Sequence, residues 1–319
     1  MLKIFITLLI ILSFSTAQYS LRTVHLGGAQ RAGENNTFRV TVLNNGNPVH
    51  TVERTLPFDV PYPATYLNEE TGALVLCFIF DGFVEMYDAT GDKIWSQNFF
   101  KDISPNYERT IGVALGRNNV AILTSDVLLQ NASVHYFAVN GAKQWERKLP
   151  HSLGYEIAMS PDEKTVIAGS YNVEQETVSR SAAIFSSTGS MQLNIDILFR
   201  KVAFSNDNGL LALISERELV TVSMETKKEI GRIAKQRENA IFTDVCWDRN
   251  SFVVQESEVV FHPEKRYYYS NPTFTWYATD MVKQAERHLE NTTYQRSQLV
   301  PSTQGVEFRY DHQKIILQQ

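Results

Sequence analysis

One unit made of two β-hairpins recurs about six times along the 319-residue chain, and half of a unit stands at each end. In the first hairpin, two short apolar strands flank a polar turn. Its copies are Ala64–Leu76, Val113–Leu123, Ile157–Ile167, Val202–Ala212, Val245–Val254 and Glu307–Leu317. The copies of the second hairpin are Thr37–Val49, Val84–Trp95, Val134–Trp145, Ala182–Leu193, Leu219–Ile230 and Thr273–Ala285. Such a unit cannot bury its apolar faces alone, so the repeats are expected to stack on one another.

The order of the hairpins predicts a closed array. The chain begins with a second hairpin and finishes with a first one, so residues 37–56 and 304–318 can pair into one composite blade that leaves no open edge. We therefore predict an all-β fold, a β-propeller of six four-stranded antiparallel blades closed by its N- and C-terminal hairpins. Seven blades are the alternative. Residues 18–319 are expected to form this single domain.

The spacing of the repeat predicts one insertion. Equivalent positions of the first hairpin are spaced by 48, 44, 45 and 43 residues, at Leu67, Leu115, Met159, Phe204 and Trp247. These intervals are typical of four-stranded blades. The next interval, from Trp247 to Arg309, is 62 residues, so we expect an insertion at about Glu256–Asn271.

The N-terminus has the pattern of a cleavable signal peptide. Lys3 precedes an apolar run, and small residues end the segment at Ala17. The run is too short to span a membrane, and no later segment is long enough, so we expect an exported periplasmic or extracellular protein without a membrane span.

The net charge of −5 is spread along the chain and gives no reason to expect nucleic acid as a partner. A monomer is expected. Asn35, Asn131 and Asn291 fit the glycosylation acceptor pattern, whose use depends on the host.

The two cysteines, Cys77 and Cys246, lie in apolar strand patterns of different units. Buried free cysteine behaves as a small apolar side chain, and distant blades seldom bring two Cα atoms close enough for a bridge. We expect both to be free. A disulfide between them is the alternative in an exported protein.

The segment Tyr87–Trp95, with an aspartate, a Thr-Gly turn and a tryptophan, resembles the repeat of the pyrroloquinoline-quinone-like and WD40-like propeller superfamily. Phe137–Trp145 is a looser copy, and from Ser181 onward the tryptophan is lost. Trp95 and Trp145 stand four residues after their turn glycines, so we expect both to pack between blades. The resemblance supports the fold. It also implies that the loops from second to third strands, and from fourth to next first strands, share the usual binding face.

The sequence lacks the linear motifs of the enzymes considered. It has no adjacent cysteine pair of the kind found in many quinone-dependent propellers, no sialidase box, no Gly-x-Ser-x-Gly and no zinc-type spacing among its seven histidines. The acidic turns Asn68–Glu70, Pro161–Glu163 and Asn206–Asn208 are explained by turn chemistry, with calcium as the alternative. We assign no catalytic residue, cofactor or metal.

Several residues on the expected binding loops are aromatic or basic, the types enriched at the energetic centres of protein interfaces. They are Tyr107, Arg109, Tyr171, Arg237, Tyr267, Tyr268 and Tyr269. We predict a non-catalytic binding or assembly scaffold that presents this face to a protein, peptide or glycan. For the three consecutive tyrosines, the alternative is a strand whose alternate rings pack inward. On the innermost strands, the polar residues expected to face the channel are Glu156, Lys201, Asp244 and Glu307. For the whole chain, the alternative is a hydrolase, lyase or oxidoreductase with its site at the channel mouth.

Overall fold

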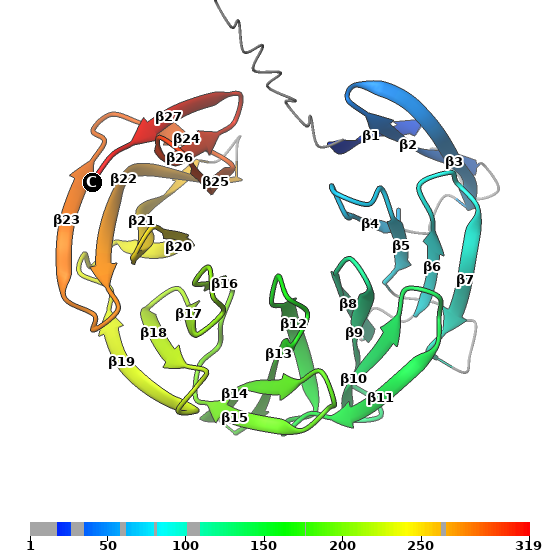
Figure 1. The fold of residues 1–319 in the computed structure, drawn as a ribbon, viewed down its shortest axis with the longest axis horizontal. Helices are drawn as coiled ribbons and strands as arrows, with labels where there is room; N and C mark the ends of the chain where they lie inside the picture. The colour runs from blue at the N-terminus through cyan, green and yellow to red at the C-terminus, as the bar shows by residue number, and fades with distance from the viewer. Residues whose placement is uncertain are drawn as a thin grey trace, which may run out of the picture. The chain divides into compact units, whose positions relative to one another are not determined.

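The computed structural model describes residues 18–26, 35–57, 62–79, 82–100, 109–175, 177–262 and 266–319. These residues form strands and no helices, and the strands assemble into seven antiparallel sheets (Figure 1). Accordingly, this part of the chain holds no helix long and apolar enough to cross a membrane. The chain divides into two compact units. Unit 1 contains residues up to Leu76 and Glu85–Trp95, and unit 2 contains Cys77–Val84 and Ser96–Gln319.

The first two sheets contain the N-terminal strands. The three-stranded sheet of unit 1 has the order β1 (Tyr19–Leu26), β2 (Asn35–Asn44), β3 (Asn47–Pro57). The next sheet has residues in both units, in the order β4 (Ala64–Leu67), β5 (Leu74–Phe78), β6 (Phe83–Tyr87), β7 (Lys93–Asn98). Within unit 1, His50 of β3 lies against the turn glycine Gly91, and Arg54 of β3 forms a 2.9 Å ion pair with Glu85 of β6.

Five sheets follow in unit 2. Three of them have four strands in chain order: β8 (Arg109–Leu115), β9 (Asn119–Asp126), β10 (Asn131–Ala138), β11 (Lys143–Lys148); β12 (Leu153–Met159), β13 (Thr165–Glu174), β14 (Thr177–Ser186), β15 (Met191–Ile195); and β16 (Lys201–Phe204), β17 (Leu210–Ile214), β18 (Glu218–Ser223), β19 (Lys228–Ala234). The fourth has β20 (Ala240–Asp248), β21 (Ser251–His262), β22 (Arg266–Ala278) and β23 (Lys283–His288), with β24 (Thr293–Tyr294) paired to β22. The last has β25 (Ser297–Ser302), β26 (Gly305–Tyr310) and β27 (Gln313–Leu317).

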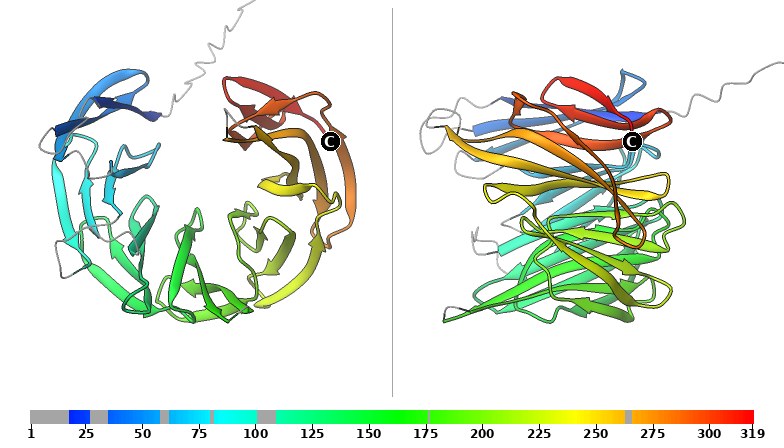
Figure 2. Two further views of the ribbon diagram at one scale, coloured as in Figure 1. Left: turned by 180° about the vertical axis from the view of Figure 1, so that it is seen from behind. Right: turned by 90° about the vertical axis from the view of Figure 1, so that its left-hand side faces the viewer.

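In unit 2, each sheet buries its apolar face against the next sheet along the chain. Trp145 of β11 and Phe185 of β14 share one apolar cluster, while Phe199 and Leu213 belong to the next. Two further clusters join β16–β19 to β20–β23, and β20–β23 to the C-terminal sheet. In the sheets β8–β11, β12–β15 and β16–β19 of unit 2, Figure 1 shows the first strand innermost and the fourth outermost, and Figure 2 shows the same order from behind. This is the stacking that the repeat predicts.

All twelve hairpins that the repeat predicts are present. The prediction that each end of the chain consists of a single hairpin is wrong. Each end carries one more strand than expected, β1 before the N-terminal hairpin and β25 before the C-terminal one. Because β25 contacts β20 and takes the first position of its sheet, Glu307 lies on the second strand, β26, and not on an innermost strand. The sequence did not predict strand β25 because it contains Pro301, and proline is unfavourable in a central strand. It is accommodated because β25 lies at the edge of its sheet.

Other sequence predictions can be compared directly. Cys77 and Cys246 are free and buried, as predicted. Trp145 packs between sheets, as predicted: its ring centroid lies 5.9 Å from that of Phe185, and its Nε1 donates a 2.8 Å hydrogen bond to the carbonyl of Ser187. Trp95 lies half-buried on β7. The expected insertion at 256–271 falls within the long hairpin β21–β22.

Candidate functional site

In unit 2, the antiparallel order places two kinds of connection at the same end of the sheets. They are the hairpin ends from second to third strands and the connections from fourth to next first strands. We call this surface the loop face. It contains the ends of β9–β10, β13–β14, β17–β18 and β21–β22, and the connections β11–β12, β15–β16 and β19–β20.

Exposed apolar side chains gather on the loop face. Among the described residues of unit 2, eight large apolar side chains with exposures of 37% to 70% lie there: Val127, Leu128, Leu129, Val173, Val178, Leu198, Val259 and Phe261. The three exposed elsewhere in this part of the chain are Met191, Ile230 and Val282, on outer strands or on the opposite turn. Scattered apolar side chains are ordinary on a surface, so their concentration at one end of the sheets makes the loop face the candidate site.

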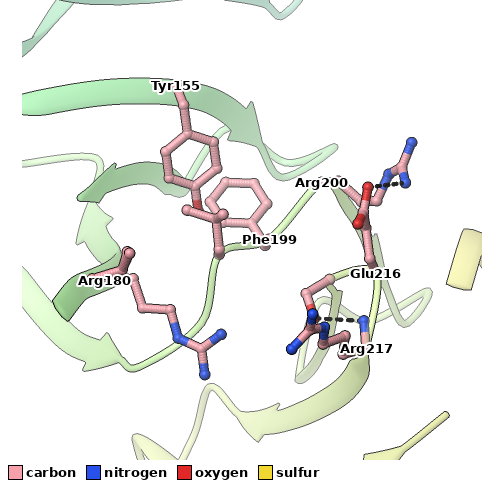
Figure 3. Close-up of a pocket in the computed structure, with 9 residues that line it drawn as sticks. Tyr155, Arg180, Phe199, Arg200, Glu216 and Arg217 are labelled. Atoms are coloured by element: carbon pink, nitrogen blue, oxygen red, sulfur yellow. Dashed lines mark hydrogen bonds and ion pairs between the residues drawn. The ribbon is translucent and has the colours of Figure 1, made fainter. Parts of the chain in front are cut away.

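A cavity of about 620 Å³ opens between the sheets β12–β15 and β16–β19 (Figure 3). We call it the arginine pocket. It is lined by Tyr155, Val178, Arg180, Leu198, Phe199, Arg200, Ser215, Glu216 and Arg217. These residues come from β12, from the start of β14, from the β15–β16 connection and from the β17–β18 turn, so the pocket belongs to the loop face.

Two aromatic rings form the apolar wall of the pocket. The rings of Tyr155 and Phe199 lie 5.7 Å apart between centroids, and Phe199 is buried. Tyr155 lies flat against β13 because residue 169 is glycine: a Cβ there would lie 2.3 Å from the Cζ of Tyr155. The Tyr155 hydroxyl is 3.4 Å from the carbonyl oxygen of Ile197, and burial raises the pKa of the phenol. The tyrosine is therefore neutral and fixed in place.

Two of the three arginines in the pocket have acidic partners. Arg180 donates to Asp196 at 2.9 Å and lies 3.0 Å from Glu218, and Arg200 lies 3.2 Å from Glu216. For the exposed guanidinium of Arg217, the described residues supply no ion pair or side-chain hydrogen bond. Figure 3 shows Arg180 and Arg217 extending from opposite sides beneath the two rings. Within the described part of the chain, Arg217 therefore faces the cavity without an acidic partner.

The structure places the predicted partner-binding residues in separate surroundings. Arg109 is buried, 2.8 Å from Asp126, and Arg237 donates to the carbonyl oxygens of Glu256 and Asn271 at 2.6 and 3.1 Å. Tyr171 is half-buried beside Tyr155, with 5.9 Å between ring centroids, so it lies next to the arginine pocket.

The three consecutive tyrosines all lie on β22. Tyr269 stacks on Tyr294 at 5.7 Å, and Tyr268 is half-buried. Tyr107 and the side chain of Tyr267 lie outside the described residues. A binding role for these residues stays a prediction.

Sequence reasoning missed the arginine pocket. Its lining residues come from four segments spread over more than 60 positions, and no linear motif joins them. The connection rule alone could have drawn attention to residues 196–200 and 215–217, which also belong to the loop face.

Two acidic side chains on the first strands of their sheets have raised pKa values. Burial raises the pKa of Glu156 on β12 and of Asp244 on β20. Lys201 of β16 acts electrostatically on both carboxyl groups. Asp244 also accepts a 2.7 Å hydrogen bond from the backbone N–H of Leu299, which ties β20 to β25.

No protein-family model matches the sequence, and a comparison with curated protein sequences finds no match either. Solved structures do match. A structure titled "Structure of Dos1 propeller" has a TM-score of 0.58 at 12% identity, covering 86% of this chain and 71% of that one. Chaetomium thermophilum Sqt1, bound to the N-terminus of the ribosomal protein L10, has a TM-score of 0.55 at 13% identity, covering 85% and 71%.

Kuenenia stuttgartiensis hydrazine synthase gives a TM-score of 0.52 at 13% identity, covering 78% of this chain and 74% of that one. At these identities the likeness concerns the fold alone. Together with the antiparallel sheets, it shows that this chain has the fold of the β-propeller proteins.

Proposed function

We propose that this protein is an exported, non-catalytic β-propeller that binds a partner protein or peptide through the loop face. The observation that carries the proposal is the concentration of exposed apolar side chains there, led by Leu128, Leu129 and Phe261. Burying them against a partner would contribute about 25 cal/mol per Å² of apolar area, before the costs of association. Aliphatic side chains favour a protein or peptide over a glycan, whose surface is rich in hydroxyl groups.

The similar structures support this proposal only at the level of fold. Sqt1 is bound to the N-terminus of L10, whereas another match is a hydrazine synthase, so one fold serves different functions. The alternative function is an enzyme. It is favoured by the raised pKa values of Glu156 and Asp244 beside Lys201, since such perturbation is frequent in active sites. In a binding scaffold, the double substitution Glu156→Gln and Asp244→Asn leaves partner binding intact.

Affinity capture tests the proposal. Residues 18–319 serve as bait, and wild type is compared with a loop-face variant carrying Leu128→Ser, Leu129→Ser and Phe261→Ser. The matched control is Val282→Ser, because Val282 is 59% exposed on the β22–β23 turn, at the opposite end of the sheet. We expect the loop-face variant to lose the captured partner and Val282→Ser to retain it. Capture that all three baits share equally would contradict the proposal.

The same proposal includes the number of blades and the location of the protein. The described strands give four four-stranded sheets, one five-stranded sheet and a three-stranded sheet at each end, so we propose seven blades, the terminal two being three-stranded. Closure between the ends then follows the usual need to protect sheet edges. Processing after Ala17 is part of the proposal and is checked by N-terminal sequencing of the exported protein.

A further inference from the structure

We propose that the arginine pocket binds an acidic peptide segment in which a large apolar side chain stands next to an aspartate or glutamate. In this arrangement, the carboxylate pairs with Arg217 and the apolar side chain packs against Tyr155, Val178 and Leu198. The inference rests on the proposed function and deepens it by naming the chemistry of the partner.

The apolar part of the ligand follows from the walls of the pocket. The exposed apolar surface of the cavity comes from Val178 and Leu198, with exposures of 51% and 39%, and from the half-buried ring of Tyr155, whereas Phe199 also lines the cavity but is buried. The cavity volume of about 620 Å³ lies within the range of pockets that enclose a ligand. A large aliphatic or aromatic side chain would replace water on surfaces that are otherwise left exposed.

The acidic part follows from charge. The chain carries a net charge of −5, yet the pocket is lined by three arginines and one glutamate. Arg180 and Arg200 already have acidic partners, which leaves Arg217 to bind the ligand. A planar guanidinium can hold a carboxylate through two parallel hydrogen bonds. Glu216 and Glu218 close by repel a doubly charged group, so a singly charged carboxylate fits better than a phosphate.

A peptide, in preference to a small acid, follows from the surroundings of the pocket. Val178 and Leu198 belong both to the lining and to the exposed apolar set of the loop face, so the apolar surface continues out of the cavity. A peptide chain can place one side chain in the pocket and lay its neighbours on the hairpin ends. A small carboxylic acid would leave that outer surface exposed.

Peptide display on phage tests the inference. The immobilised protein, residues 18–319, selects from a random library of twelve-residue peptides fused at their C-termini, so that no free C-terminal carboxylate is present. We expect wild type to enrich peptides in which Asp or Glu adjoins Leu, Phe, Trp or Tyr. For a selected peptide, Arg217→Gln should weaken binding by about 10- to 100-fold. The matched control Lys227→Gln, which removes a cation from an exposed turn at the opposite end of the sheet, should leave binding unchanged.

Two further variants separate the parts of the site. Arg217→Glu should select peptides with Lys or Arg in place of the acid, and Leu198→Ser should reduce the preference for large apolar side chains while retaining the acid. The inference is overturned if the selected peptides lack an acidic residue, or if wild type and Arg217→Glu select the same peptides. It is also overturned if no peptide is selected and the protein instead sediments with vesicles of phosphatidylcholine and phosphatidylglycerol.

Failure here and failure of the proposed function give different results. If capture depends on Leu128, Leu129 and Phe261 but not on Arg217, the loop face binds its partner without an acidic anchor in the pocket. If peptide selection depends on Arg217 but partner capture is unchanged in the Leu128, Leu129 and Phe261 variant, the pocket is a binding site and the proposed scaffold function of the loop face is wrong.

Discussion

At the scale of single residues, the turns of the second hairpin repeat one backbone requirement. Gly91, Gly141 and Gly189 each have positive φ at the turn between the third and fourth strands. In later copies, Lys227 (φ 54°) and Met281 (φ 69°) hold the same conformation without being glycine. The loss of glycine makes these two copies less similar to the others in sequence, although the turn itself is kept.

Lys227 and Met281 are expected to respond differently to replacement by glycine. Lys227 is exposed, so Lys227→Gly should raise the free energy of unfolding by about 0.5 to 1 kcal/mol through relief of the left-handed conformation. Met281 packs against Gly231 and the adjoining apolar cluster, so Met281→Gly should lower it. Urea denaturation of the two variants measures both effects. If Lys227→Gly lowers the free energy of unfolding, the left-handed conformation of Lys227 does not cost stability.

His135 should make stability depend on pH. The side chain is half-buried between Phe99 and Thr124, and this burial lowers the pKa of the imidazole below its usual 6.5, despite the opposing charge of Glu146. As the pH drops below 6.5, the unfolded chain therefore binds more protons than the folded one, so stability falls until the pH reaches the folded pKa. Glu156 and Asp244 have raised pKa values and act in the opposite direction, so a difference measurement is needed.

Melting temperatures of wild type and His135→Gln between pH 7 and pH 5 provide that difference. The variant can keep a hydrogen bond to Thr124 but does not titrate. We expect its melting temperature to fall less than that of wild type over this interval. If the melting temperatures of the two proteins fall equally between pH 7 and pH 5, His135 makes no contribution to the pH dependence of stability.

At the scale of elements, neighbouring sheets in unit 2 are joined by specific contacts as well as by apolar packing. Trp145 stacks on Tyr136, with 4.9 Å between ring centroids, and reaches the turn of the next sheet. The carboxylate of Glu163, on the β12–β13 turn, accepts from the backbone of Asn118 and from the side chain of Asn119 on the preceding sheet. The matched position of the tryptophans predicted the first contact. Nothing local in the sequence marks the second, because the partners are about 45 positions apart.

Trp145 is the contact whose removal should cost most. Trp145→Ala is expected to lower the free energy of unfolding by about 3 to 5 kcal/mol, because it removes a buried ring and leaves a cavity. Trp145→Phe keeps an aromatic ring but loses the hydrogen bond to Ser187 and should cost about 1 kcal/mol plus lost packing. Chemical denaturation compares the two. Equal small effects would mean that the tryptophan does not join the sheets.

Gly169 links strand packing to the arginine pocket. Gly169→Ala would push the ring of Tyr155 off β13 and into the cavity, since the new Cβ would otherwise lie 2.6 Å from the Tyr155 hydroxyl oxygen. We expect weaker binding of an acidic–apolar peptide selected on wild type. The variant Gly169→Ala with Tyr155→Leu, which shortens the displaced side chain, should recover part of the binding. Unchanged binding by Gly169→Ala would exclude Tyr155 from the wall of the site.

At the scale of the whole molecule, topology determines which side chains share a face, whereas sequence spacing determines which residues form strands. The repeat therefore predicted the hairpins, and the superfamily rule predicted the loop face. The exposed tip residues Leu128 and Leu129 and the arginine pocket were not predicted, because exposure and the convergence of four segments are properties of the folded chain. The extra end strands escaped because they stand outside the repeated pair of hairpins.

Site-specific photo-crosslinking tests the central claim, binding through the loop face, most directly. A benzophenone amino acid replaces Leu128 in one protein, Phe261 in a second and Val282 in a third, and each is irradiated in the extract that supplies the partner. We expect one crosslinked partner that is shared by positions 128 and 261 and absent from position 282. Crosslinking that is equal at position 282, or confined to it, would show that the loop face does not bind the partner.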